Sequence, residues 1–389
     1  MKSKNRTISK PVAPPKVVTN DAENLSARNI SFVVQGQIQP ETYTFLQALR
    51  RNFPEAELVL STWRGKYDPC FRRITDKMIY CKDPGAVVCS YYREVAQWNN
   101  LNRQLVTTMA GLNAASRPFV AKVRTDFTLE NSTLLSFWNR YPKRQSDALL
   151  FRHRIIVPSL YSRVYSDQPT PLPVPFHPSD MFAFGRKDDM RRFFGSCPLL
   201  TEKELGNWLP RYPNRVPYPF CQWRWAPEQA IFYYAAKSKF PGLRFDDWTS
   251  FNKEILTVSK KLLMNNFIFV NPCQIGLFSY KHRDALRGAN LHGDWPGLIT
   301  NSFFEDWYKA SLDSDLVVHS KNKGTAAERY ELHKERMLYP LKKCFVLWGG
   351  LPSRLRAYGM AQRIFTSANG KKFGFGWKEM NSLLKKATR

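Results

Sequence analysis

The feature of this sequence that most constrains its fold is a regular alternation of short apolar runs with amphipathic segments between residues 30 and 127. Four apolar runs of strand length predict buried β-strands at residues 30–38, 56–63, 77–85 and 118–127. Two segments with apolar residues at helical spacing separate them, at residues 40–53 and 99–116. Strands that are apolar on both faces and are joined by helices are typical of parallel sheets with both faces covered. We therefore expect an α/β fold built on a mostly parallel, Rossmann-type sheet flanked by helices.

Small and polar residues stand at or just past the carboxyl ends of the predicted strands. They are Gln35, Gly36, Ser61, Thr62, Asp83 and Asp126. In open α/β sheets, ligands bind in the crevice beyond those ends. We expect these residues to surround one ligand-binding crevice. The alternatives are that Ser61 and Thr62 pack in the core and that Asp83 only forms a Pro-Gly turn.

The most informative stretch is KVRTDF, residues 122–127, at the end of the fourth predicted strand. Lys122, Arg124 and Asp126 occupy alternate positions and are therefore expected to point to one face. A carboxylate there is a suitable ligand for a divalent cation such as Mg²⁺, which is commonly shared with substrate phosphates. The two basic side chains could supply charge to a diphosphate. The alternative is a salt bridge within the sheet.

Several well-known sequence motifs are absent. The loop after the first predicted strand has a single glycine, so the G-x-G-x-x-G pattern of dinucleotide sites is missing, and so is the P-loop pattern. No G-x-S-x-G sequence indicates a serine hydrolase. The seven cysteines include no C-x-x-C pair, which favours reduced thiols in a cytoplasmic protein over a disulfide framework or a zinc site.

The charge of the chain predicts a polyanionic partner. There are 59 Lys and Arg against 32 Asp and Glu, a net charge of +27. Residues 319–389 alone hold 16 basic and 4 acidic residues, interleaved with aromatic side chains, which is typical of a segment that binds an anionic membrane surface. A nucleic-acid-binding protein is the rival hypothesis, but no zinc-finger, RNP-like or basic-heptad pattern supports it, so we expect no nucleic acid partner.

Composition divides the chain into three parts. Residues 1–28 are rich in Lys, Pro and Asn and are predicted to form a flexible basic arm. Residues 29–250 are predicted to form the ligand-binding domain, with further helices at 186–194 and 226–240. Residues 251–389 are predicted to be a separate, basic C-terminal region. No run of about 18 apolar residues predicts a membrane span.

A set of segments in order resembles one family. ISFVVQGQI, FPEAELVLSTW, NNLNRQLVTTMAGL, AKVRTDF and HPSDMFAFG follow one another, over residues 30–235, as in the WavE lipopolysaccharide-synthesis family. The resemblance implies a glycosyltransferase with a GT-A-like sheet, which moves a sugar from a nucleotide-sugar donor to a lipid-linked acceptor, a lipopolysaccharide core or a related cell-surface polysaccharide. It also implies a cytoplasmic protein bound peripherally at the inner face of the inner membrane.

The resemblance assigns roles to individual residues. RTD stands where such enzymes carry a D-x-D metal motif, which makes Asp126 the expected ligand of Mg²⁺ or Mn²⁺. Arg124 replaces the first acid and could itself neutralise the diphosphate. Asp180 and Glu228 are the candidate bases for the acceptor hydroxyl; alternatively, Asp180 holds acceptor hydroxyls and Glu228 only occupies a first helical turn.

The expected donor-binding set combines the strand-end residues with basic residues around them. Its members are Gln35, Gly36, Ser61, Thr62, Asp83, Arg103, Lys122 and Arg124. Arg103 is expected to reach the nucleotide or its phosphates from its helix; the alternative is a solvent-facing arginine. A non-catalytic binding module of the same fold is a further hypothesis, because the first acid of D-x-D is missing. The sequence leaves the sugar, the nucleotide, the acceptor and the stereochemistry open.

Overall fold

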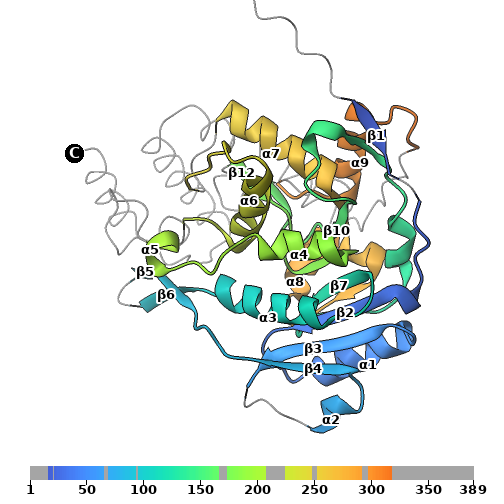
Figure 1. Ribbon diagram of the computed structural model, residues 1–389, viewed down its shortest axis with the longest axis vertical. Coiled ribbons are helices and arrows are strands. Elements are labelled where there is room, and N and C mark those ends of the chain that lie inside the picture. The colour runs from blue at the N-terminus through green and yellow to red at the C-terminus, as the bar shows by residue number, and fades with distance from the viewer. Residues whose placement is uncertain are drawn as a thin grey trace, which may run out of the picture.

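The computed structural model describes eight stretches of the chain. They are residues 16–20, 22–64, 69–92, 95–165, 173–206, 224–247, 252–290 and 297–317. Their centre is a seven-stranded sheet in the order β14-β10-β13-β7-β2-β3-β4. Figure 1 shows β3 and β4 at one end of the molecule and α7, α9 and β1 at the opposite end. The expected α/β class is confirmed.

The strands of this sheet reproduce the alternation predicted from the sequence. They are β2 (Ile30–Gln35), β3 (Glu57–Trp63), β4 (Lys77–Cys81), β7 (Phe119–Arg124), β10 (Ile155–Pro158), β13 (Phe182–Arg186) and β14 (Phe267–Val270). β4, β3, β2 and β7 pair in parallel, as do β10 and β14. Only β13 runs antiparallel to its neighbours β7 and β10. The sheet is therefore mostly parallel, as expected.

Helices cover both faces of the sheet. The longer ones are α1 (Thr42–Asn52), α3 (Leu101–Ala114), α4 (Lys187–Gly195), α6 (Pro227–Lys239), α7 (Lys253–Asn266), α8 (Arg283–Asn290) and α9 (Asn301–Ser311), and the two short ones are α2 (Pro69–Arg72) and α5 (Glu202–Leu205). Phe32 packs on Phe53 just after α1, while its neighbour Val33 faces Gly111 of α3. Successive strand residues point to opposite faces, so α1 and α3 lie on opposite sides of the sheet.

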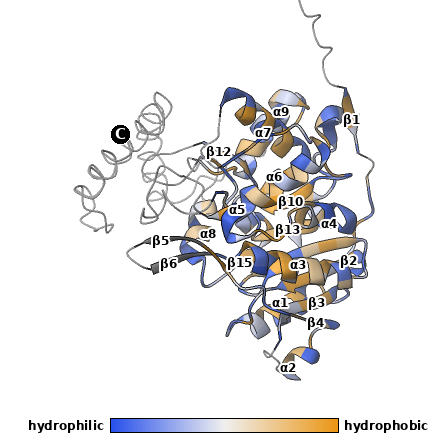
Figure 2. Ribbon diagram, turned by 60° about the vertical axis from the view of Figure 1, so that its left-hand side comes forward, coloured by the Kyte–Doolittle hydropathy of each residue, from blue (hydrophilic) through white to orange (hydrophobic). Residues whose placement is uncertain are grey.

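Close packing explains the glycine in α3. A Cβ on Gly111 would lie only 2.2 Å from a methyl group of Val33, so a larger residue would push the helix off the sheet. The buried apolar side chains form one continuous cluster that includes residues of both halves of the sheet. Figure 2 shows hydrophobic residues concentrated on the central strands and on helices that face them, α3 and α6 among them.

Several small strands lie outside the main sheet. They pair as β1 (Val17–Thr19) with β9 (Lys143–Gln145), β5 (Val87–Tyr92) with β6 (Val95–Asn99), β11 (Arg163–Tyr165) with β12 (Pro173–His177), and β8 (Thr128–Leu129) with β15 (Leu277–Phe278). Short 3₁₀ helices lie at Ala27–Asn29, Thr133–Phe137, Ser146–Ala148 and Pro272–Ile275. The pairing of β8 with β15 joins segments far apart in the chain, directly beside the predicted site.

Two boundaries expected from composition differ from the described structure. β14 follows residue 250 and pairs with β10, so the sheet continues beyond the boundary expected there. Residues 17–19 of the expected flexible arm form β1, which pairs with β9. Composition misses both because pairing with a distant strand, not local charge, orders these segments. Residues 1–15 and the basic segment 319–389 lie outside the described residues. Within the described part, no helix combines the length and hydropathy needed to cross a bilayer.

Candidate active site

The predicted site residues of β2 and β7 lie side by side at the carboxyl ends of these two strands. Gln35 is paired in register with Arg124. The backbone NH of Gly36 donates to the carbonyl of Ser61 on β3 (3.0 Å), and the NH of Thr125 donates to the carbonyl of Gln35 (3.0 Å). Gly36 has φ of 120°, a conformation that strongly favours glycine. Gly36 and Asp126 therefore flank the same edge of the sheet, as the sequence predicts.

Arg124 and Asp126 form a two-pronged ion pair just beyond β7. Nε of Arg124 donates to Oδ1 of Asp126 (2.9 Å) and the NH2 nitrogen donates to Oδ2 (2.7 Å). The Asp126 side chain is 4% exposed and that of Arg124 is 28% exposed. Both carboxylate oxygens are therefore occupied by one guanidinium, which is the salt bridge that the sequence left open as an alternative.

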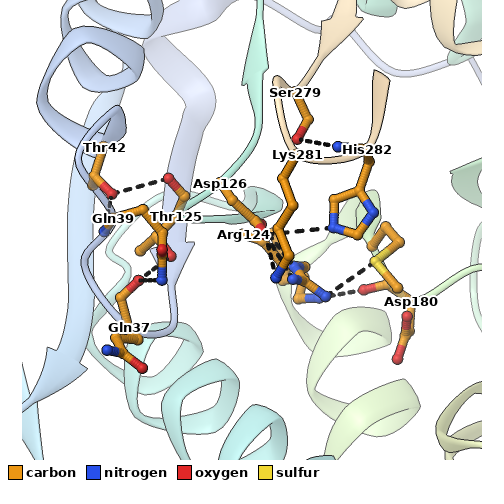
Figure 3. Close-up of polar contacts among 12 residues, drawn as sticks. Gln37, Gln39, Thr42, Arg124, Thr125, Asp126, Asp180, Ser279, Lys281 and His282 are labelled. Carbon is orange, nitrogen blue, oxygen red and sulfur yellow. Dashed lines mark hydrogen bonds and ion pairs between the residues drawn. The ribbon is translucent and has the colours of Figure 1, made fainter. Parts of the chain in front are cut away.

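Two further basic side chains, Lys281 and His282, converge on Asp126, and the sequence analysis missed both. Nζ of Lys281 lies 3.8 Å and Nε2 of His282 lies 3.5 Å from Oδ2 of Asp126, and Figure 3 shows both side chains aimed at it. They follow β15, whose pairing with β8 brings this turn next to residue 126. In the sequence these two residues appear only as part of the basic stretch SYKHR, and nothing in that stretch indicates that they contact Asp126.

Charge explains the protonation states of this cluster. Burial raises the pKa of the Asp126 carboxyl, but the imidazole of His282 and the guanidinium of Arg124 outweigh it and hold that pKa well below its usual range. Burial acts to lower the pKa of Arg124, and Asp126 outweighs it and raises it. The pair is thus ionised throughout the physiological pH range.

Lys122 and Asp180 meet beneath this cluster. Lys122 is fully buried, and its Nζ donates to the backbone carbonyl of Asp180 and lies 5.5 Å from the ring centroid of Phe194. Burial lowers the pKa of Lys122 to about 8, although the charge of Asp180 opposes the shift. Oδ1 of Asp180 is buried and has no hydrogen-bond partner among the described residues. Lys122 thus fixes the backbone at Asp180, while one carboxylate oxygen of Asp180 can still accept a hydrogen bond.

Glu228, the second predicted base, lies close to Asp180 in the first turn of α6. Burial, and then the charge of Asp180, raise the pKa of Glu228 to about 8. Nε2 of His177 lies 3.9 Å from its Oε2. Nδ1 of His177 lies 2.9 Å from the carbonyl of Tyr161, which has an unusual φ of 60°. The carbonyl requires a proton on Nδ1, so in neutral His177 the Nε2 atom facing Glu228 is a proton acceptor.

Asp83 and Arg103 form a second ion pair, beyond β4. Nε and the NH2 nitrogen of Arg103 donate to the two carboxylate oxygens of Asp83 (2.8 and 2.7 Å), which lowers the pKa of Asp83. No described hydrogen bond links this pair directly to Arg124 or Asp126. One turn further along α3, Thr107 donates to Oε1 of Gln35 (2.6 Å), so the helix does contact the site.

Ser61 and Thr62 occupy the last part of β3 and are fully buried. Oγ of Ser61 lies 3.7 Å from Sγ of Cys81, whereas Oγ1 of Thr62 has no hydrogen-bond partner among the described residues. These positions match the alternative that both side chains pack within the fold; their role in donor binding stays a prediction.

The residues around Asp126 do not fit a resident divalent cation. Its two oxygens bind Arg124, and the side chains nearest to it are themselves basic. Among the described residues, no group of three or more His, Cys, Asp or Glu side chains could hold a metal ion. Mg²⁺ needs oxygen ligands, and cations at this distance would repel it. We therefore derive no chemical step through a metal at Asp126.

The comparisons with known proteins place the chain in a family. Among solved structures, the chain is similar to an active-site mutant of LgtC. The match has 12% sequence identity and a TM-score of 0.30, and it covers 75% of this chain and 97% of that chain. No curated protein matches it. The sequence model for WavE lipopolysaccharide synthesis matches residues 30–295, well over half of the chain. This chain therefore belongs to the WavE lipopolysaccharide synthesis family.

Proposed function

We propose that the protein is a glycosyltransferase of lipopolysaccharide synthesis, which moves a sugar from a nucleotide sugar to a lipopolysaccharide-core or related cell-surface polysaccharide acceptor. One observation carries the proposal: three basic side chains converge at the carboxyl end of a parallel sheet, beside two buried, interacting carboxylates. Family membership supports the same conclusion. The alternative, a binding module of the same fold, would hold the nucleotide sugar without transferring the sugar.

The basic side chains suit the leaving group. When the acceptor oxygen attacks the anomeric carbon, the bond from that carbon to the diphosphate oxygen breaks, and its electron pair leaves with the diphosphate. Arg124, Lys281 and His282 would stabilise this growing negative charge. In this proposal, Asp126 holds the three groups in place, so they need no reorganisation during the reaction.

The buried carboxylates suit the proton transfer. In an inverting displacement, the acceptor hydroxyl must lose its proton to a base. Glu228 is our choice, because a carboxyl with a pKa of about 8 is a much stronger base than an ordinary one. His177 adjoins it and can accept the proton at Nε2. Asp180, with its unpartnered oxygen, is then placed to accept a hydrogen bond from an acceptor hydroxyl.

A glutamate exchange tests this function. A panel of nucleotide sugars is first screened for thermal stabilisation of the protein, and release of nucleoside diphosphate is then measured with lipopolysaccharide acceptors. We expect Glu228→Gln to keep the donor-induced stabilisation and to lower transfer by about 10²- to 10⁴-fold. Below a pH of about 8, wild-type transfer should rise with pH as Glu228 ionises, and the residual rate of the variant should lose this dependence.

Glu202→Gln, an exposed exchange on α5, is the matched control and should leave transfer unchanged. Undiminished transfer by Glu228→Gln would remove Glu228 from the mechanism. Stabilisation by a nucleotide sugar without transfer to any acceptor would favour the binding module. Two results together would favour the nucleic-acid alternative: the protein binds nucleic acid with an affinity that falls steeply with salt, and no nucleotide sugar stabilises it.

The basic segment 319–389 supports a second part of the proposal, peripheral attachment to the cytoplasmic face of the inner membrane. Each basic residue near an anionic surface contributes on the order of 1 kcal/mol. We expect the full chain to sediment with anionic phosphatidylglycerol vesicles and to be released from them by salt. It should not sediment with zwitterionic phosphatidylcholine vesicles. Equal binding to both lipids would refute the electrostatic attachment.

A further inference from the structure

An exposed aromatic side chain stands beside the basic cluster and has no role in the proposal so far. Tyr280 is 63% exposed, and it directly precedes Lys281 and His282 in the turn after β15. Few large apolar or aromatic side chains of the described residues are exposed; besides Tyr280 they are Val17, Trp98, Leu199 and Val317, and among these only Val317 is more exposed than Tyr280. Of this group, Tyr280 alone is adjacent in sequence to residues that contact Asp126.

The ring of Tyr280 is held in place. It stacks on Phe45 of α1 with ring centroids 5.6 Å apart and planes 16° from parallel, and Phe278 meets it edge-on at 4.9 Å. The backbone on both sides is fixed as well, because β15 pairs with β8 and the NH of His282 donates to Oγ of Ser279 (3.3 Å). An aromatic ring that is supported on one face and still mostly exposed loses little freedom when a second flat ring stacks on it.

The helix that supports the ring is bonded to the segment that carries Asp126. Oγ1 of Thr128 donates to the carbonyl of Phe45 (3.1 Å), and Oγ1 of Thr42, one turn earlier, donates to the carbonyl of Thr125 (3.1 Å). The start of α1, which supports Tyr280, is therefore bonded to both sides of Asp126. Because Tyr280 and Lys281 are consecutive in the chain, a ligand with its phosphates on Lys281 is near enough for its remaining part to reach this ring.

We propose that Tyr280 is a stacking platform for the nucleobase of the donor, so that one turn, residues 280–282, recognises both the base and the diphosphate of a nucleotide sugar. The inference rests on the proposed function. Stacking suits a base because every nucleobase offers a flat π-face, and alanine substitution at such platforms typically weakens binding measurably. A phosphate group has no flat ring and therefore would not stack on Tyr280.

The test compares three ligands that share a diphosphate: two carry different bases and one carries none. We would titrate each ligand by calorimetry into the wild type and into the Tyr280→Ala and Tyr280→Phe variants. The ligands are uridine diphosphate, guanosine diphosphate and, as the base-free probe, inorganic pyrophosphate. We expect the wild type to bind at least one nucleoside diphosphate more tightly than pyrophosphate. Tyr280→Ala should lower the affinity for that nucleotide roughly tenfold, which corresponds to about 1.4 kcal/mol of binding free energy, and should leave the affinity for pyrophosphate unchanged. Tyr280→Phe, which keeps the ring, should bind like the wild type.

Trp98→Ala, which removes the exposed aromatic ring of β6, is the control and should change neither affinity. If Tyr280→Ala weakened pyrophosphate as much as the nucleotide, the ring would only position Lys281 and the platform would be refuted. Equal affinity of the wild type for pyrophosphate and both nucleotides would refute it too, while leaving the proposed function intact. Failure of the wild type to bind any of the three ligands or any nucleotide sugar would overturn the proposed function itself.

Discussion

Two arginine–aspartate pairs lie beyond the carboxyl ends of this sheet, and they differ in the burial of the carboxylate far more than in geometry. Arg124–Asp126 beyond β7 and Arg103–Asp83 beyond β4 are both two-pronged, with distances between 2.7 and 2.9 Å. The Asp126 side chain is 4% exposed, whereas those of Arg103 and Asp83 are 38% and 39% exposed. The first pair also has Lys281 and His282 around it.

This difference in burial decides what each pair can do. Water screens the exposed pair, and such pairs contribute little to stability, typically below about 1 kcal/mol. The buried carboxylate is surrounded by more positive charge than it can neutralise, so the cluster around Asp126 keeps an attraction for an added anion. Equal geometry therefore does not imply equal function: the buried cluster keeps excess positive charge, which suits the diphosphate that we propose it binds, and the exposed pair is largely neutralised within itself.

The largest effect should follow from removing the buried charge. Asp126→Asn keeps the size of the side chain but leaves the basic groups without their counter-charge, so they would repel one another. We expect a loss of about 2 kcal/mol or more in the free energy of unfolding and a fall in transfer of about 100-fold. The matched variant Asp83→Asn should lose less than about 1 kcal/mol. Denaturant unfolding and transfer assays on both variants measure the contrast.

The pH dependence of stability sharpens this contrast. The pKa of Asp126 is depressed below its ordinary value of 3.8, so its stabilisation is fully present above that value and is lost only as the pH falls towards the folded-state pKa. The part of the stability difference between wild type and Asp126→Asn that comes from ionised Asp126 should therefore shrink only below a pH of about 4. A folded Asp126→Asn variant with undiminished transfer would make Asp126 a simple strand-end residue.

The parallel half of the fold could be predicted because its signals are local. The apolar run at 30–38 predicted β2, and the strand stops at Gln35 because Gly36 turns the backbone into a positive-φ conformation. Alternation also placed Lys122 and Arg124 on one face, and in the structure their register partners on β2 are Val33 and Gln35, which are likewise two residues apart. For such elements, periodicity and strand ends carry the information.

The rest of the site depends on contacts between distant parts of the chain. No periodicity pairs β15 with β8, so Lys281, His282 and Tyr280 could not be assigned to the surroundings of Asp126. His177 was within the quoted HPSDMFAFG segment, but its role depends on Tyr161 and Glu228, which other elements supply. The sequence gives residue types, and burial, which decides their pKa values, appears only in the folded chain.

The smallest expected effect tests the exposed pair. Arg103→Ala removes a guanidinium that already binds Asp83 and reaches Oδ1 of Asn100 (3.2 Å). A donor phosphate would have to compete with Asp83 for it, and at physiological salt the charge is screened within about 8 Å. We expect less than about 1 kcal/mol of lost stability and a change in donor affinity of less than about threefold. Calorimetric titration of a nucleotide sugar measures that affinity. A loss of about tenfold or more would show that the pair opens to bind the donor, as the sequence predicted for Arg103, and the contrast between the two pairs would then describe only the ligand-free protein.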